Sequence, residues 1–592
     1  MVDDVPATTL AGQLAGWRAA FVPARWLRGY QASWLPKDAV AGVTLAAYAI
    51  PVSLAYATLA GLPPHYGIYC YLVAGPAYAL FGSSRQLAVG PTSAISLLVG
   101  TTLLGMAEGD PHKWAQIAAL TALIFAAMSV LAWALKLSTL VDFISETILL
   151  GFKAGAALTI AMTQLPKLFG VPGGGENFFE RAWILGSQLG ATNLAVFGFG
   201  VAAIALLVVG ERLLPGRPVA LLVVAASIVA LSATSLGDLG FKTVGVLPAG
   251  LPDLALPSLR ARDVDGVIPL AFACFLLGYI EGVSAARTLA QKNGYEIDAR
   301  QELLALGAAN AAAAFGQGYP VAGGLSQSTV NDKAGAKTPL ALVFASMTIG
   351  LCLLYLTGLL ANLPSVVLAA IVLVAVKGLV DIPELRRTWA LSRMEFWVAI
   401  AAFAGVLLLG ILNGVLLAAG VSMLLLIHRV ARPQVARLGR VPGTRRYTDC
   451  ERHPDNEAVP RVLIVRVEGS VLYFNTSHVR ERVRALVAAE GESLRLVIWD
   501  LSTSPYVDIA GARLLGEFQR ELVARGIAMR IVEAIASVRD LLREEVGASV
   551  GEISRRISID DVMTGFSVAD LSNPDASDVL APGARKDTSG AV

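Results

Sequence analysis

The chain has 592 residues, of which 55% are hydrophobic and 16% are charged, and its formal net charge is +2. A soluble domain does not need so much apolar sequence for its core, so the composition indicates a membrane protein with several spans. The basic residues are spread over the chain, so this charge gives no reason to expect a nucleic-acid partner.

Residues 1–37 are polar and aromatic, with Trp17, Arg18, Arg25 and Trp26 among them. These residue types favour the cytoplasmic membrane interface, so we expect a cytosolic N-terminal segment lying along membrane lipid. No short apolar run precedes a small-residue cleavage site, so no cleaved signal peptide is expected. Apolar segments then follow at residues 38–59, 65–81, 92–107, 114–135, 139–165, 192–210 and 218–236, and again at 267–288, 299–315, 324–334, 338–360, 363–380, 395–411 and 413–428.

These segments predict an α-helical transmembrane transporter domain at residues 38–430, with fourteen spans in two sets of seven. An odd number per set forces the halves into opposite orientations, so we predict 7+7 inverted repeats at residues 38–236 and 267–428. With the N-terminus inside, the more basic loops all lie on the cytoplasmic side, as the positive-inside rule requires. We therefore expect a multi-pass protein of the inner membrane with both termini cytoplasmic. The basic residues of these loops are Lys136, Arg212, Arg217, Arg287, Lys292, Arg300, Lys333, Lys337, Arg386, Arg387 and Arg393.

Two glycine-rich stretches interrupt the apolar pattern at corresponding places. Residues 316–338 read GQGYPVAGGLSQSTVNDKAGAKT, and residues 82–96 read GSSRQLAVGPTSAIS. A shift of 234 residues aligns Gly90 with Gly324 and Thr92 with Ser326. Irregular backbone is tolerated at membrane depth only where it is buried or lines a cavity, and paired breaks of this kind indicate the binding site of a transporter. Each break is followed by a helix start, whose free N–H groups and positive dipole end favour an anion. The alternative is that the glycines only permit close helix packing.

Beyond residue 440 the composition becomes that of a soluble domain. Strands are expected at residues 461–467, 495–500 and 527–532, and helices at 477–489, 508–525 and 537–545. This alternation predicts a cytosolic α/β domain at residues 445–565. Residues 566–592 are rich in Ser, Asp, Gly and Pro and are expected to be disordered.

Four cysteines, Cys70, Cys274, Cys352 and Cys450, have no spacing typical of a metal site. The spans contain no pairing of a nucleophile with a base. We therefore expect no metal, no other cofactor and no enzymatic activity.

Taken together, the sequence resembles the SulP family of anion transporters with a C-terminal STAS domain. The resemblance rests on DAVAGVTLAAYAIPVSLAYATLAGLPPHYGIY (residues 38–69), GSSRQLAVGPTSA (82–94), EGVSAARTLAQKNGYEIDARQELLALGAAN (281–310), GGLSQSTVNDKAGAKT (323–338) and WDLSTSPYVDIAGARLL (499–515). It implies a core subdomain that carries the substrate and moves like an elevator against a gate subdomain. It also implies a homodimer, and a STAS domain that either supports the dimer or docks a cytosolic partner.

The resemblance further implies a substrate site between the starts of the third and tenth helices, facing the first and eighth. By position, its residues are Tyr56, Thr92, Glu281, Leu325, Ser326 and Gln327. Three positions depart from the pattern. Many animal members have Arg at residue 327, the position of Val52 is often Gln, and Ala510 replaces the Ser or Thr that anti-sigma-factor antagonists phosphorylate.

Glu281 is the only acidic residue in its apolar segment, which makes it a functional candidate. Two helix starts supply roughly +1 charge together, which leaves a divalent anion under-neutralised. An ionised carboxylate about 8 Å away would repel each unit of anion charge by about 2 kcal/mol at an effective dielectric near 20. We therefore predict symport of a small inorganic or organic anion with protons, with Glu281 as the coupling residue. The alternative role for Glu281 is a structural ion pair, for example with Arg287.

Sulfate or a dicarboxylate is the predicted substrate. The competing hypotheses are a sodium-coupled bicarbonate transporter, an anion exchanger and an uncoupled, channel-like anion conductor. Sodium needs several oxygen ligands, and Ala285 one turn from Glu281 supplies none, although Ser284 does. A nucleobase permease is a further rival, but that family usually lacks a STAS tail.

Overall fold

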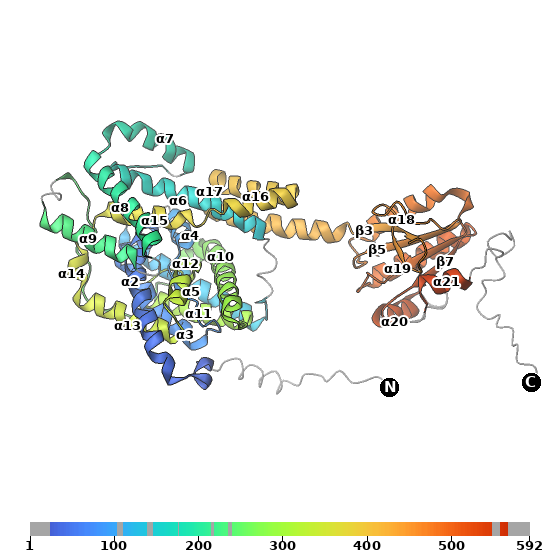
Figure 1. Ribbon diagram of the computed structural model, residues 1–592, viewed down its shortest axis with the longest axis horizontal. Helices are drawn as coiled ribbons and strands as arrows, with labels where there is room; N and C mark the ends of the chain where they lie inside the picture. Colours follow the sequence, from blue (N-terminus) through green and yellow to red (C-terminus); the bar gives the residue numbers. More distant parts are fainter. Residues whose placement is uncertain are drawn as a thin grey trace, which may run out of the picture. The chain divides into compact units, whose positions relative to one another are not determined.

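The computed structural model describes residues 24–103, 110–138, 146–175, 177–214, 218–234, 239–546 and 557–565. The chain divides into two compact units, Met1–Ser422 and Met423–Val592, which we describe separately (Figure 1). Most of the N-terminal segment and the tail at residues 566–592 lie outside the described residues, so their expected behaviour stays a prediction.

The first unit is built almost entirely from helices. A helix lies at each of the fourteen predicted segments, and the last two segments form the single long element α17. Gly410 breaks α17 with a φ of +83°, a left-handed conformation that glycine adopts without strain. The helices are α2 (Leu35–Leu59), α3 (His65–Phe81), α4 (Ser93–Leu103), α5 (Pro111–Ala134), α6 (Glu146–Phe169), α7 (Phe178–Gln188), α8 (Leu194–Leu213), α9 (Val219–Ala233), α10 (Ala261–Asn293), α11 (Ala299–Phe315), α12 (Leu325–Lys333), α13 (Leu340–Tyr355), α14 (Thr357–Leu360), α15 (Ser365–Lys377), α16 (Ile382–Leu391) and α17 (Arg393–Ala431).

Among the described residues, seven helices are long and apolar enough to cross a membrane. They cover Ala32–Leu59, Lys113–Ala134, Thr147–Phe169, Leu194–Leu213, Asp263–Asn293, Ser365–Leu391 and Arg393–Gly410. Three shorter apolar helices, Ser93–Leu103, Val219–Ala233 and Leu340–Tyr355, accompany them. Short apolar helices next to broken backbone are the expected form of discontinuous spans.

Two helices had no counterpart in the sequence prediction. The helix α7 lies in the segment expected to be an outer loop, and α16 lies between two predicted spans. Each begins with a side-chain cap, because the Asn177 side chain accepts from the Glu180 amide and Asp381 accepts from the Glu384 amide. Trp183 on α7 is 80% exposed, which fits a helix that lies on the surface of the membrane region.

The helices pack in two groups. In the first group, α5 packs on α10 and α11, α3 packs on α11 and α13, and α2 packs on α13. In the second group, α15 packs on both α6 and α8, and Gly151 of α6 lies directly against the backbone of Ala399 in α17. The two groups meet where α2 contacts α9 and α15 and where α4 contacts α6.

The second unit contains a five-stranded sheet of order β4-β3-β5-β6-β7. The strands β5 (Val462–Glu468), β6 (Leu496–Asp500) and β7 (Ala528–Val532) are parallel, whereas β3 (Gln434–Arg440) pairs antiparallel with both β5 and β4 (Tyr447–Asp449). The helices α18 (Thr476–Glu490), α19 (Ile509–Ala524) and α20 (Ala536–Glu545) lie within two residues of their predicted bounds, and α21 (Ile559–Gly565) follows. The sheet begins at Gln434, ahead of residue 445, where we expected this domain to start.

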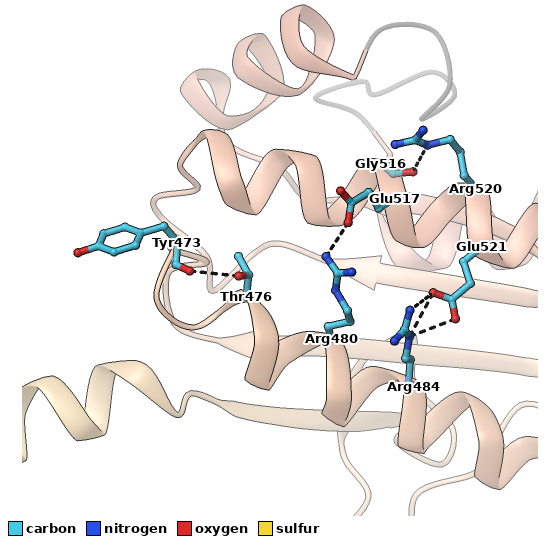
Figure 2. Close-up of polar contacts among 8 residues, drawn as sticks. All are labelled: Tyr473, Thr476, Arg480, Arg484, Gly516, Glu517, Arg520 and Glu521. Carbon is cyan, nitrogen blue, oxygen red and sulfur yellow. Dashed lines mark hydrogen bonds and ion pairs between the residues drawn. The ribbon is translucent and has the colours of Figure 1, made fainter.

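The core of this unit forms around Trp499 of β6, which is fully buried and packs edge-on against Phe518 of α19. Beside this core, two parallel ion pairs join α18 to α19, one between Arg480 and Glu517 and one between Arg484 and Glu521, each at 2.6 Å (Figure 2). The arginines are four residues apart, as are the glutamates, so both pairs lie on facing sides of the two helices.

Candidate functional site

The two glycine-rich breaks meet in space. The strand β1 (Val89–Gly90) pairs antiparallel with β2 (Ala322–Gly323), with Val89 opposite Gly323 and Gly90 opposite Ala322. A two-fold relation between inverted halves brings equivalent stretches together antiparallel, as observed here. All four residues are buried, which satisfies the rule that irregular backbone at membrane depth is covered by protein.

The antiparallel pair aims two helix starts at one region. The helix α4 begins at Ser93, three residues after β1, and α12 begins at Leu325, two residues after β2. Each start presents N–H groups that lack partners within the helix, together with the positive end of the helix dipole. The chain therefore brings together the two helix starts that the aligned breaks predicted, and ends of this kind favour an anion.

Close packing fixes the position of this pair. A Cβ added to Gly90 would lie 2.3 Å from the ring of Tyr71, and one added to Gly323 would lie 2.8 Å from the Leu87 side chain. On the other side, Gly278 and Gly282 of α10 are the residues that lie against β2. Glycine is therefore needed most clearly at Gly90, where any side chain would displace the Tyr71 ring, while a side chain at Gly278 would be tight.

Gln327 forms part of the framework of the site. Its side chain is buried, and its Nε2 donates to the carbonyls of Ala88 at 3.0 Å and Ala322 at 3.4 Å. Its Oε1 accepts a hydrogen bond from the Tyr71 hydroxyl. The amide thus holds both strands and α3 together. Its family position indicated substrate contact, but that position does not specify where the amide points.

Two further residues of α12 support the same framework and were not predicted. The Ser328 hydroxyl accepts from the Ala88 amide at 2.8 Å, and Asn331 Nδ2 donates to the Gln86 carbonyl at 3.0 Å. Their spacing in the sequence was the available signal, because residues 327, 328 and 331 share one face of a helix.

Thr92 and Tyr56 lie beside the start of α4. Thr92 is buried, and its Oγ1 is one of the few buried side-chain oxygens among the described residues that has no hydrogen-bond partner. A buried hydroxyl without a partner is costly unless a ligand or water satisfies it. Tyr56 of α2 is also buried, and its hydroxyl interacts with Ser93 at the start of α4. Leu325 and Ser326, in contrast, are exposed at the start of α12.

Glu281 lies on α10 at the crossing with β2. It precedes Gly282, which lies against Gly323, and it is close enough to Tyr56 to act on it electrostatically. Lys153 of α6 is the basic residue that acts on Glu281. Both side chains are partly buried. The acid of the first helix group therefore faces a cation of the second group.

The chain is also similar to known proteins, both in sequence and in fold. Residues 35–402 match the Sulfate permease family, and residues 453–546 match the STAS domain. A probable sulfate transporter of Mycobacterium tuberculosis is 34% identical over 90% of this chain and 94% of its own length. The chain belongs to the sulfate permease family. The chloroplastic sulfate transporter 4.1 of Arabidopsis thaliana is 32% identical to this permease over 88% of the chain and 78% of its own length.

Solved structures agree with the fold of this permease. The murine Solute Carrier 26 family member A9 anion transporter, in the inward-facing state, superimposes with a TM-score of 0.84 at 23% identity, covering 93% of this chain and 94% of the other. The transmembrane domain of the cyanobacterial bicarbonate transporter BicA superimposes with a TM-score of 0.60 at 21% identity, covering 67% of this chain and all of the other. The transmembrane fold with its C-terminal STAS domain is thereby established, and membership of a transporter family agrees with the expected absence of enzymatic activity.

A second buried acid, Glu302 of α11, holds the loop that leads into β1 of this permease. It is 3% exposed, and its carboxylate accepts from the Tyr78 hydroxyl at 2.8 Å, the Ser83 hydroxyl at 2.6 Å, the Ser83 amide at 2.8 Å and the Ser84 amide at 3.1 Å. The sequence analysis did not identify this residue. It lies in the first turn of α11 beside Arg300 and Gln301, where an acidic residue is ordinary, so nothing in the sequence marked it out.

Proposed function

We propose that this family member is a secondary active carrier that moves a small anion together with a proton. The observation that carries this proposal is the β1–β2 pair, which brings two helix starts together beside Tyr56 and Glu281. The anion would be held by the N–H groups of α4 and α12 and by the hydroxyls of Thr92 and Ser326. The unpartnered Oγ1 of Thr92 supports this assignment. Gln327 would act by holding the frame, and Leu325 by covering the open side.

Charge balance supports proton coupling. The two helix starts supply about +1, and Lys153 partly offsets an ionised Glu281, so the site with a bound divalent anion would still carry a net negative charge while Glu281 is charged. Protonation of Glu281 removes its repulsion of the anion and brings the site closer to neutrality. A proton and the anion would therefore bind together, which is the requirement for symport.

The division of charges between the helix groups supports an elevator movement. Glu281, Tyr56 and Thr92 all belong to the first group, whereas Lys153 belongs to α6 of the second. A shift of the first group past the second would move Glu281 away from Lys153. A protonated Glu281 makes this separation easier, because moving a neutral carboxyl away from Lys153 gives up little electrostatic attraction.

The relatives support sulfate as the anion to test first, since those in Mycobacterium tuberculosis and Arabidopsis thaliana are named sulfate transporters. The BicA likeness makes bicarbonate a second candidate, and a dicarboxylate is the third. Sodium coupling, anion exchange and channel-like conduction are the rival mechanisms. The proposal includes an inner-membrane location with both termini cytoplasmic, a homodimer, and the domain limits given above, with the STAS domain extended back to β3.

The test uses purified full-length protein in proteoliposomes with radiolabelled sulfate, bicarbonate or succinate outside. An inward proton gradient should drive accumulation of one of these anions above its external concentration, and a protonophore should abolish that accumulation. Uptake driven by sodium alone would favour sodium coupling. Uptake that never exceeds the external concentration under either gradient would contradict the carrier proposal.

The variant Glu281→Gln isolates the coupling step. It should lose accumulation driven by the proton gradient while still exchanging labelled for unlabelled anion. Glu296→Gln removes an acid from an exposed position beyond the end of α10 and serves as the control. Unchanged proton dependence in Glu281→Gln would refute the role given to Glu281.

A further inference from the structure

A cavity of about 300 Å³ lies between the two helix groups, away from the candidate site. The first group contributes Thr58 of α2, Leu97 and Thr101 of α4, and Trp114 of α5. The second contributes Lys167 of α6 and Arg181 of α7, together with the loop at residues 172–175. The cavity is thus built from the same helices, α2 and α4, that carry Tyr56 and Ser93.

The cavity lies toward the far end of α4 from the candidate site. The helix α4 starts at Ser93, and Thr101 is eight positions further along it. At a rise of about 1.5 Å per residue, the cavity lining runs from about 6 Å along α4 at Leu97 to about 12 Å at Thr101. An anion that enters from this face and travels between the helix groups would meet the cavity first.

The charged side chains of the cavity have one sign. Lys167 and Arg181 are both partly buried, and among the described residues that line the cavity none is acidic. Glu180, the neighbour of Arg181 in the chain, interacts with Arg181 electrostatically but does not line the cavity. Arg181 Nε donates to the Gly175 carbonyl at 3.0 Å, which orients the guanidinium along the glycine loop.

Helix ends alone would not make this cavity attractive to an anion. The C-terminal ends of α2, α4 and α6 lie near it and carry about half a negative charge each, while the start of α5 carries about half a positive charge. With Lys167 and Arg181 the balance is positive by about one charge. A net charge of about +1 favours weak and reversible binding of an anion. Such binding suits the entrance of a transport pathway better than a site of tight binding.

We propose that this cavity is an anion-binding vestibule in which Lys167 and Arg181 hold the transported anion before it reaches the paired helix starts. Both cations belong to the helix group that lacks the candidate site, so they remain in place while the site moves. This inference rests on the proposed function, because it identifies the approach to that same site.

The test compares Lys167→Gln, Arg181→Gln and their double variant with the wild type in proteoliposomes, with labelled sulfate added on the cavity face. The half-saturating concentration should rise roughly tenfold in the double variant, because the attraction of two nearby charges is lost. The maximal rate should stay near that of the wild type. The matched control is Lys242→Gln, an exposed cation in the segment that Asn193 ties to the end of α6, and hence on the same face.

A chemical rescue separates anion attraction from a helix-capping role for Lys167. In Lys167→Cys, with Cys450→Ser to remove the partly exposed native thiol, a positively charged aminoethyl methanethiosulfonate should restore the low half-saturating concentration. The negatively charged sulfonatoethyl reagent should raise it further. Sulfate should also slow both reactions by occupying the cavity.

The vestibule proposal would be overturned if the double variant had the half-saturating concentration of the wild type, or if only its maximal rate changed. It would also be overturned if the positively and negatively charged reagents had equal effects on Lys167→Cys. If the wild type itself transports none of the three anions, the proposed function fails instead, so the two failures are distinguishable.

Discussion

Gln327 and Ala88 are 239 residues apart in the chain, yet the Gln327 Nε2 donates a hydrogen bond to the Ala88 carbonyl at 3.0 Å. This bond ties the start of α12 to the break that leads into α4. With the bonds that Ser328 and Asn331 make to the same segment, it holds the two halves of the protein in register. The consequences can be tested directly.

Gln327→Ala should destabilise the fold. The substitution leaves the buried Tyr71 hydroxyl without its acceptor, at a cost of about 1–3 kcal/mol, and leaves the Ala88 carbonyl with the Gly324 amide alone. We expect a lower thermal unfolding temperature in detergent and a lower maximal transport rate. Leu325→Ala, at the exposed start of the same helix, is the control and should leave the unfolding temperature within error. A stable Gln327→Ala protein with only a raised half-saturating concentration would instead assign the amide to the substrate.

Thr92→Val separates binding from stability. Valine has the same shape but lacks the unpartnered Oγ1, so unfolding should occur at the same temperature or slightly above it. If the hydroxyl contacts the anion, the half-saturating concentration should rise about five- to twentyfold, the equivalent of about 1–2 kcal/mol. Thr121→Val, whose hydroxyl donates within α5, should leave that concentration unchanged. Equal kinetics in the two variants would remove Thr92 from the site.

Glu302→Ala should be far more harmful than Glu302→Gln. The carboxylate Oε1 accepts from the Ser83 hydroxyl and from the Ser83 and Ser84 amides, whereas Oε2 accepts only from the Tyr78 hydroxyl. Glutamine can place its one oxygen at the Oε1 position and keep three of the four bonds, whereas alanine keeps none. Loss of these bonds in Glu302→Ala frees the loop before β1, so transport should fall and thermal stability should drop by about 3 kcal/mol or more. Hydrogen exchange at residues 82–86 should rise in the same variant, and wild-type exchange in Glu302→Ala would contradict this account.

The STAS domain offers a contrast between buried and exposed ion pairs. Asp500 is buried and bound to Arg466 at 2.7 Å, so Asp500→Asn should cost about 3 kcal/mol and raise hydrogen exchange in β5 and β6. Glu521→Gln breaks one of the solvent-exposed pairs with Arg484 (Figure 2) and should cost under about 1 kcal/mol. Similar effects of the two substitutions would show that the Arg466 pair is not a stabilising element.

Cys450 should react slowly with alkylating reagents near neutral pH. Burial raises the pKa of its thiol, an effect that Arg437 opposes and that Asp449 and Glu490 reinforce. A raised pKa reduces the thiolate fraction at a given pH, so the alkylation rate should keep rising above the pH at which a free cysteine, with a pKa near 8.5, has levelled off. The measurement is the rate of iodoacetamide labelling against pH, with free cysteine as the reference. A profile that levels off at or below that of free cysteine would contradict the effect of burial.

The sequence predicted the helices well because apolar length is a local property. It also located the two glycine-rich breaks in the apolar pattern, because glycine and proline change the backbone conformation at their own positions. The pairing of Val89 with Gly323 could not be predicted, because two-residue strands leave no periodic pattern and the partners are far apart in the chain. The direction of the Gln327 amide could not be predicted either, because a family position specifies a place on a helix but not the rotamer of the side chain.

The strand β3, which begins the sheet of the second unit, was not predicted for a different reason. Residues 434–440 read QVARLGR, and their arginines obscure the apolar alternation typical of a strand. In the structure, Val435, Ala436 and Leu438 are buried in the sheet, while Arg437 forms an ion pair with Glu490. Pairing with β5 makes this segment a strand, and the charges in its sequence do not reveal that pairing.

The close packing around β1 and β2 leaves little room for local widening. The Tyr71 ring fills the space beside Gly90, and the Leu87 side chain fills the space beside Gly323, so a methyl group at either position would displace its neighbour. Under the carrier proposed above, we therefore expect the anion to be released by a change in the side of the membrane that the intact strand pair faces. Bulky residues in place of these glycines should slow loading and unloading alike.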